Sequence, residues 1–289
     1  MQNLFVQYIE RMECNEEFKM TIKMVATDID GTILKHTGEF NPKVIDCIKN
    51  LVKNGIKVIL ITGRMYKSAK KIADSIGITT PIVAYQGALV KDNSLTENVF
   101  YERYIPNEIS KRIIDWAKLQ NVHINLYMND ELYVEAENEF TKKYVTFQKI
   151  PFNIASFDEI ELNSVNKILL IDYENPDKIT KINNQLKQDF PELFIVKSTD
   201  FFCEVCQKEA TKGHGLKYLQ ELYGIKKEET LTIGDHNNDI ELLLAGGIKV
   251  AMGNATKELK SVADYVTDDV DNDGFVKAIE KFIKVGVNV

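Results

Sequence analysis

The chain has 289 residues, of which 44% are hydrophobic and 27% charged, so it has the composition of a globular protein and a length that favours two domains. Its net charge of −7 leaves no basic surplus for nucleic acid or an anionic membrane. No apolar run approaches the ~20 residues of a membrane span, so we expect a cytoplasmic protein with no nucleic-acid, membrane or obligatory protein partner.

The first regular element follows an N-terminal stretch of irregular pattern. Residues 1–22 are expected to be an extension, either disordered or not part of the native protein. Residues 24–27 form a short apolar strand that ends at the polar turn 28–32. Asn41 then caps a helix that has Pro42 at its first position.

Strands and helices alternate over the next forty residues. The unbroken apolar run 57–62 is typical of a strand buried in a parallel sheet, and Gly77 ends the helix that follows it. Residues 82–85 make a third strand. This alternation predicts right-handed βαβ units in an α/β core with a doubly wound, mainly parallel, Rossmann-like sheet.

The middle of the chain has a different pattern. Residues 124–134 alternate around a polar Asn129-Asp130 turn, which predicts an antiparallel hairpin. A strand at 165–171 and a helix at 177–190 follow. We therefore expect an inserted α+β domain at residues 86–195, which acts as a cap over the core.

Buried-strand patterns return in the last third of the chain. Residues 230–235, 249–252 and 264–267 are predicted strands, and residues 240–245 a helix. The catalytic core is therefore predicted to comprise residues 23–85 and 196–289. Cys203 and Cys206 lie in a predicted strand, and we interpret them as buried thiols rather than a redox or zinc motif.

Polar residues recur where the predicted strands of the core end. They are Asp28 and Asp30, Thr62, Asp235 and Asp239, with Lys212 near the start of a helix. Ligands of open α/β sheets bind outside the carboxyl ends of the strands, so most of these residues are expected in one crevice. Clustered carboxylates repel one another, and such crowding is tolerable if a hard cation such as Mg²⁺ lies among them or if some of the groups stay protonated. Each motif alone has an ordinary structural reading, such as a helix cap or an acidic turn.

Taken together, these motifs resemble the haloacid dehalogenase superfamily, and within it the Cof-type phosphatases with a large α/β cap. The matching segments are Asp28-Ile-Asp-Gly-Thr-Ile-Leu34, Thr62-Gly-Arg64, Lys212-Gly213 and Gly234-Asp235-His-Asn-Asn-Asp239. The resemblance spans about residues 23–285. The sequence departs from it at Gln86, where the family commonly has Asn before Gly-Ala.

The resemblance implies a role for each matching residue. Asp28 resembles the nucleophile and Asp30 the general acid and base. The residues similar to the phosphate-binding set are Thr62, Gly63, Lys212 and Asn238. Those similar to the Mg²⁺ site are Asp28, the backbone carbonyl of Asp30, Asp235 and, directly or through water, Asp239.

The implied function is a magnesium-dependent phosphatase of small phosphorylated metabolites, with sugar phosphates as the leading class, that works through an aspartyl-phosphate. Two alternatives remain open: a phosphomutase with the same aspartate chemistry, and a non-catalytic regulator that binds phosphorylated metabolites. The cap would select the substrate. Candidate cap contacts on the hairpin are His123, Asn125, Tyr127 and Tyr133, although such polar alternation is also typical of a solvated sheet face.

Overall fold

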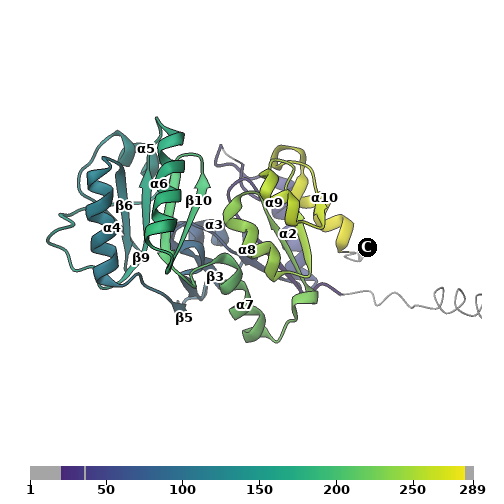
Figure 1. The fold of residues 1–289 in the computed structure, drawn as a ribbon. Helices are drawn as coiled ribbons and strands as arrows, with labels where there is room; N and C mark the ends of the chain where they lie inside the picture. The colour runs from purple at the N-terminus through teal and green to yellow at the C-terminus, as the bar shows by residue number, and fades with distance from the viewer. Residues whose placement is uncertain (1–20, 36, 284–289) are drawn as a thin grey trace, which may run out of the picture.

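The core is built on a parallel sheet. The computed structural model describes residues 21–35 and 37–283, and its strands form three sheets (Figure 1). The first sheet has the order β14-β13-β12-β1-β2, and all its pairs are parallel. Its strands are β1 (Met24–Thr27), β2 (Lys57–Leu60), β12 (Thr230–Gly234), β13 (Ile248–Ala251) and β14 (Tyr265–Val266). The predicted doubly wound α/β core is confirmed. The predicted extension lies outside the described residues, apart from Thr21 and Ile22.

Helices cover both faces of this sheet. They are α2 (Pro42–Lys53), α3 (Tyr66–Ile76), α7 (Lys212–Tyr223), α8 (Ile240–Ala245), α9 (Lys257–Val262) and α10 (Gly274–Phe282). From the centre of the sheet, the β1-to-β2 and β12-to-β13 crossovers run in opposite directions, so right-handed connections put α2 and α8 on opposite faces. α10 packs beside α2, and α7 packs beside α8 (Figure 1).

The helix termini follow the predicted signals. The Asn41 side chain accepts a hydrogen bond of 3.0 Å from the backbone N–H of Lys43 at the start of α2. Gly77 ends α3 with a positive φ of 77°, a conformation that glycine adopts without steric cost.

The third predicted strand belongs to a side sheet rather than to the parallel core. β3 (Ile82–Ala84) touches the core sheet through one bridge between Ile61 and Val83. It pairs antiparallel with β4 (Leu89–Lys91), which pairs with β5 (Val99–Glu102). The short helix η1 (Tyr85–Gly87), in which every residue has positive φ, reverses the chain between β3 and β4.

The insert is a six-stranded sheet with helices on both faces. In strand order it comprises β10 (Leu193–Thr199), β11 (Phe202–Gln207), β9 (Val165–Ile171), β6 (His123–Met128), β7 (Glu131–Val134) and β8 (Asn153–Ile154). α4 (Asn107–Leu119) and α6 (Pro176–Asp189) pack on one face in a separate apolar cluster. α5 (Glu139–Gln148) packs on the other face, and that face joins the apolar cluster of the core. The predicted hairpin is the β6–β7 pair, with positive φ at Asn129 and Asp130.

The predicted C-terminal boundary of the insert is wrong. The boundary at residues 195 and 196 falls inside β10, and both β10 and β11 pair in the insert sheet, so the insert continues to Gln207. The pairing of β11 with β9, about thirty residues away along the chain, decides the C-terminal position. The boundary at residue 86 stays a prediction; Leu89 and Val90 belong to the larger apolar cluster, and the first residue of the second cluster is Ile105.

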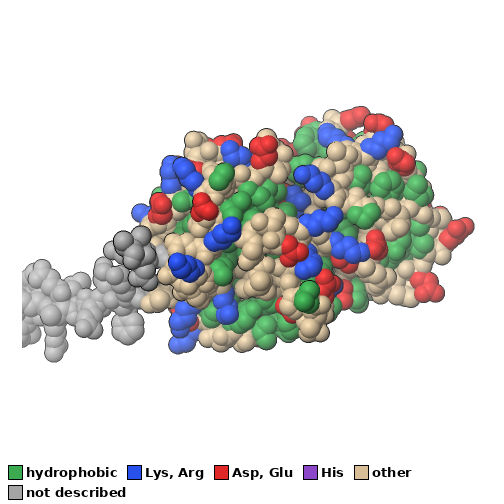
Figure 2. Space-filling model, turned by 180° about the vertical axis from the view of Figure 1, so that it is seen from behind, with side chains coloured by type: hydrophobic (Ala, Val, Ile, Leu, Met, Phe, Trp, Pro, Cys, Tyr) green, Lys and Arg blue, Asp and Glu red, His purple; other side chains and the backbone are tan. Residues whose placement is uncertain are grey.

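The surface charge and the length of the helices bear on binding to nucleic acid and to membranes. On the face shown in Figure 2, Lys and Arg side chains are interspersed with Asp and Glu rather than gathered in one basic patch. Among the described residues, no helix is both long and apolar enough to span a membrane.

Candidate active site

The topology brings the predicted residues to one edge of the core sheet. Asp28 follows β1, Thr62 follows β2, and Asp235 follows β12, the middle strand of the sheet. The neighbouring strand ends are held in register, since the N–H of Asp28 donates to the carbonyl of Ile233 at 3.1 Å. Lys212 begins α7.

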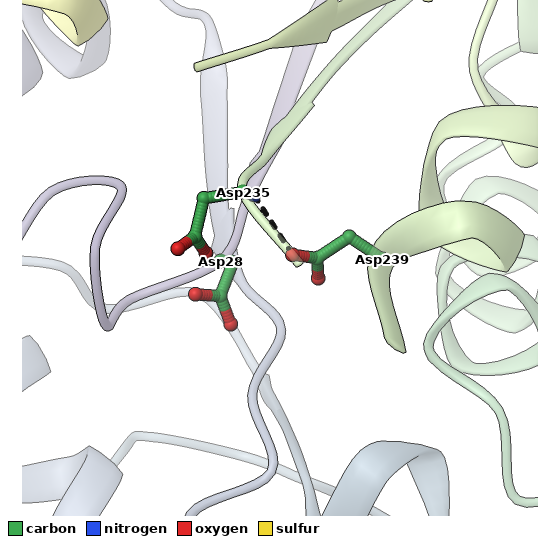
Figure 3. A group of neighbouring side chains, drawn as sticks. All are labelled: Asp28, Asp235 and Asp239. Atoms are coloured by element: carbon green, nitrogen blue, oxygen red, sulfur yellow. Dashed lines mark hydrogen bonds between the residues drawn. The ribbon is translucent and has the colours of Figure 1, made fainter. Parts of the chain in front are cut away.

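Three carboxylates lie together at this edge. One oxygen each from Asp28, Asp235 and Asp239 lies within 4.8 Å of the others (Figure 3). All three residues are buried, at 5%, 8% and 0% exposure. The ammonium of Lys212, also fully buried, lies 2.5 Å from Asp28 Oδ1 and 2.6 Å from Asp239 Oδ1. When all three carboxylates are ionised, this one cation leaves an excess of negative charge.

Asp239 organises the loop after β12. Its Oδ2 accepts hydrogen bonds from the backbone N–H groups of Asp235 at 3.0 Å and His236 at 3.1 Å. Its Oδ1 accepts from Lys212. Because both oxygens already have partners, a role in support of a metal fits this geometry better than direct ligation.

The carboxylate of Asp235 has partners that sequence reasoning missed. Asn254 Nδ2 lies 3.3 Å from Asp235 Oδ2 and 2.9 Å from the carbonyl of Gly31. Thr32 Oγ1 lies 3.5 Å from Asp235 Oδ1. The position of Asn254, soon after the predicted strand 249–252, was the available signal, because polar groups at strand ends mark such a site.

Burial perturbs the protonation of this cluster. It raises the pKa of Asp28 to about 7, although the Lys212 ammonium lowers it, and Asp239 adds to the rise. Burial and the neighbouring Asp28 also hold the pKa of Asp235 well above its usual range. The two carboxylates Asp239 and Asp28 raise the pKa of Lys212 against the effect of its burial, so Lys212 stays charged.

Asp30 does not face the acidic cluster. Its two carboxylate oxygens accept hydrogen bonds from Arg64 Nε at 2.7 Å and Nη2 at 2.6 Å, a bidentate pair. Arg64 is itself fixed by Ser68, whose hydroxyl lies 3.0 Å from Nη1. The side chain of Asp30 is therefore outside the group of three carboxylates that could hold a metal ion. Its backbone carbonyl remains the predicted ligand. Arg64, the last residue of the Thr62-Gly-Arg64 motif, thus holds Asp30 in place, a contact that the sequence pattern does not predict.

Three of the four predicted phosphate-binding residues line one cavity with Asp28. The cavity has a volume of about 990 Å³, and Thr62, Gly63 and Asn238 are in its wall. Thr62 Oγ1 accepts from the N–H of Arg64 at 3.1 Å. Lys212 is not in the wall and reaches this cavity only through its contact with Asp28.

The insert supplies an aromatic wall to the same cavity. Its aromatic lining residues are Tyr144, Phe147, Tyr173, Phe201 and Phe202, from α5, β11 and the loops after β9 and β10. None of the four hairpin candidates lines this cavity. His123 lines a second cavity, and Tyr127 is buried beneath Tyr144, with the two hydroxyls 2.5 Å apart. The substrate-facing prediction for these two residues is therefore wrong, because α5 covers that face of the hairpin.

The cysteine pair offers no metal site. Cys203 packs in the apolar cluster of α4 and α6, whereas Cys206 packs in the core cluster on the other face of the insert sheet. Both thiols are buried and free, as predicted.

The fold and the site together define an α/β protein with an inserted second unit and a buried acidic centre. A family model described as haloacid dehalogenase-like hydrolase matches residues 25–279. The chain therefore belongs to this family, and the predicted resemblance to it is confirmed.

Individual relatives match along nearly their whole length. A Haemophilus influenzae protein with a provisional phosphatase name is 31% identical, over 91% of this chain and 98% of its own. The 5-amino-6-(5-phospho-D-ribitylamino)uracil phosphatase YitU of Bacillus subtilis is 24% identical, over 91% and 98%. The solved structure of the subclass IIB sugar phosphatase BT4131 has a TM-score of 0.80 and 28% identity, and covers 90% of this chain and 98% of its own. The chain is thus a hydrolase of phosphatase type.

The acidic group fits a divalent metal, which this superfamily generally uses. Its donors are carboxylate oxygens, the ligands that hard cations such as Mg²⁺ prefer. A cation would also offset the negative charge that Lys212 alone leaves uncompensated.

Proposed function

We propose that this protein is a magnesium-dependent phosphatase that hydrolyses small phosphorylated metabolites through an aspartyl-phosphate on Asp28. The observation that carries the proposal is the position of Asp28. Its buried carboxylate contacts Lys212, lies beside Asp235, and forms part of the wall of the large cavity.

In the first step, a carboxylate oxygen of Asp28 attacks phosphorus, and the bond from phosphorus to the leaving oxygen breaks. Asp30 gives a proton to that oxygen. In the second step, Asp30 takes a proton from water, which attacks the same phosphorus and releases inorganic phosphate and free Asp28. Thr62, Gly63 and Asn238 would hold the phosphate oxygens, while Lys212 keeps Asp28 oriented.

Asp28, the carbonyl of Asp30 and Asp235 would hold Mg²⁺, with Asp239 in support. The ion, when bound, supplies positive charge to the phosphate oxygens. The side chain of Asp30 must leave Arg64 to act as an acid, because the paired guanidinium favours the ionised form of the carboxylate and holds both of its oxygens. Binding of the substrate must therefore compensate for this lost ion pair.

Sugar phosphates are the first substrate class to test, in keeping with the name of BT4131. The aromatic wall favours a second class, phosphate esters that carry a flat ring. Phe147 is 46% exposed and Phe201 36% exposed, and both line the cavity, where they could stack on such a ring. The substrate in the name of YitU contains a uracil ring.

The test is a screen of phosphorylated metabolites in which released inorganic phosphate is measured with Mg²⁺ and with a chelator. A magnesium-dependent phosphatase releases one phosphate for each substrate molecule consumed. The chelator should stop this release. Transfer to a second sugar position without phosphate release would favour a phosphomutase. Tight binding of the same compounds without turnover would favour a regulator. A cytoplasmic location remains part of the proposal.

A further inference from the structure

A chain of buried polar side chains crosses from the insert sheet to two loops of the site. We call it the crossing network and define it as Lys167 on β9, Glu204 on β11, Gln86 in η1 and Asn238 in the short helix η3 (Asn237–Asp239). These residues are 2%, 4%, 0% and 7% exposed. All four line the cavity that holds Asp28.

At the insert end, Lys167 contacts the loop that follows β2. Its Nζ donates to the carbonyl of Gly63 at 2.5 Å and lies 2.8 Å from Glu204 Oε2. It also lies 4.7 Å from the centroid of the Tyr127 ring. An ammonium group has three N–H donors. Because protein groups surround the ammonium of Lys167, it serves as an anchor to Gly63 rather than as a free contact for substrate.

At the core end, the amide of Gln86 joins the insert to the loop after β12. Its Nε2 donates to Glu204 Oε1 at 2.8 Å, and its Oε1 accepts from Asn238 Nδ2 at 3.1 Å. Its backbone N–H donates to the carbonyl of Thr62 at 3.0 Å. Gln86 therefore links Thr62, Glu204 and Asn238 through one residue.

Gly63 shows how closely the network fits against the site. A Cβ on this glycine would lie 2.4 Å from Gln86 Nε2 and 3.2 Å from Glu204 Oε1. The network thus occupies the space beside the Thr62–Gly63 peptide. Any shift of Gln86 or Glu204 changes the surroundings of the predicted phosphate loop directly.

Holding the insert against the core does not by itself require buried charged and polar side chains. A buried ion pair loses much of its Coulomb energy to desolvation, and apolar contacts of similar size hold two units together at least as well. Hydrogen bonds add direction, so they define one relative position of the insert and the loops. Asn238 Oδ1, buried in the cavity wall, has no hydrogen-bond partner among the described residues and is available to a ligand.

We propose that the crossing network is a positioning device: it seats the insert sheet on the core and thereby sets the positions of the Thr62–Gly63 loop and of Asn238. Gln86 is the central member. Its side chain is long enough for the amide to reach both Glu204 and Asn238. The kinetic part of the test rests on the proposed function, whereas the binding and shape measurements do not.

The first variant is Gln86→Asn in the full chain. Asn keeps the amide and tolerates the positive φ of 62° at this position, so the fold is retained. Its side chain is shorter by about 1.5 Å, the length of one carbon–carbon bond, so the amide no longer spans both partners. We expect kcat/KM for p-nitrophenyl phosphate and the affinity for inorganic phosphate, measured by calorimetry with Mg²⁺, to fall about tenfold.

Gln220→Asn is the matched control. Gln220 is also a buried glutamine, at 7% exposure, and its side chain donates to Thr230 at the start of β12, away from the site. It should lower thermal stability without a change in kcat/KM or phosphate affinity. Equal phosphate affinity and kcat/KM in Gln86→Asn and the native protein would overturn the proposal.

The charged pair is tested with Lys167→Met, Glu204→Gln and the double variant. Lys167→Met leaves Glu204 buried without its cation, so we expect a larger radius of gyration by small-angle X-ray scattering as the insert moves off the core. The double variant should recover part of the compact shape, because no buried charge remains. An unchanged radius of gyration in folded Lys167→Met would count against the anchor, and if that variant does not fold, Gln86→Asn decides.

The two proposals fail in different ways. If the native protein turns over no phosphate ester but the variants still change phosphate affinity and shape, the proposed function is wrong and the positioning device stands. If the native protein is a phosphatase and neither Gln86→Asn nor Lys167→Met changes these measurements, only the positioning device is wrong.

Discussion

At the scale of single residues, Asp28 and Lys212 form the centre of the site. Their charged atoms are 2.5 Å apart and buried, yet burial still raises the pKa of Asp28 to about 7. A carboxylate in such a place is costly for stability. The cost is consistent with a group retained for its reactivity.

Asp28→Asn should therefore remove activity and keep the fold. Asn has nearly the same shape but cannot act as the nucleophile, so we expect kcat to fall by about 10³-fold or more. The thermal midpoint should stay the same or rise, since a buried acid is removed. Asp46→Asn, at an exposed position on α2, is the matched control and should keep full activity. Normal magnesium-dependent turnover by Asp28→Asn would refute the nucleophile assignment.

Asp30→Asn tests the acid and base role. Loss of proton transfer should lower kcat by about 10²-fold or more and leave KM nearly unchanged. The loss should be smaller for p-nitrophenyl phosphate than for an alkyl phosphate, because a good leaving group needs less protonation. Steady-state kinetics with both esters checks this expectation. A change in KM alone would contradict the role.

At the scale of elements, the placement of Lys212 depends on the contact between α7 and α8. Gly213 is the second residue of α7, and a Cβ there would lie 2.2 Å from the carbonyl oxygen of Glu241 in α8. The overlap is between the Cβ on the backbone of α7 and the backbone of α8, so no flexible side chain can move aside. It can be relieved only if the two helices separate, which moves Lys212 away from Asp28.

Gly213→Ala should therefore reduce both stability and activity. We expect a loss of about 1–3 kcal/mol in the free energy of unfolding, from overpacking, and a clear fall in kcat/KM. Gly224→Ala, just beyond the other end of α7, is the control. It has a positive φ of 62° but open space around the added Cβ, so it should cost stability only. Urea unfolding and steady-state kinetics separate the two effects. A Gly213→Ala enzyme with native kcat/KM would show that α7 tolerates the shift.

The helices and strands also show which parts of the site could be predicted from the sequence. The residues around Asp28, Thr62 and Asp235 could be predicted, because polar groups at the ends of apolar strands form a local pattern. The aromatic wall could not, because α5 and the β10–β11 region meet only in the fold. Nor could the reversal at Gln86, where a non-glycine residue adopts positive φ through tertiary contacts with Thr62 and Glu204.

At the scale of the whole molecule, acidic charge connects metal binding to stability. Asp28 has a pKa of about 7 in the folded, metal-free protein and an ordinary value of 3.8. Between these pH values the folded state holds more protons at this group than the unfolded chain. The contribution of Asp28 to the free energy of unfolding therefore falls as pH rises through this window.

A divalent cation competes with the same proton, so its binding should strengthen over that range. We expect Mg²⁺ to raise the thermal midpoint more at pH 8 than at pH 6, because binding to the folded state alone stabilises it. The measurement is thermal unfolding with Mg²⁺ and with a chelator, at matched ionic strength, since the net charge of −7 also responds to screening. Asp28→Asn should lose most of the pH dependence of the shift. Equal shifts at both pH values in the native protein would mean that the cation binds away from Asp28.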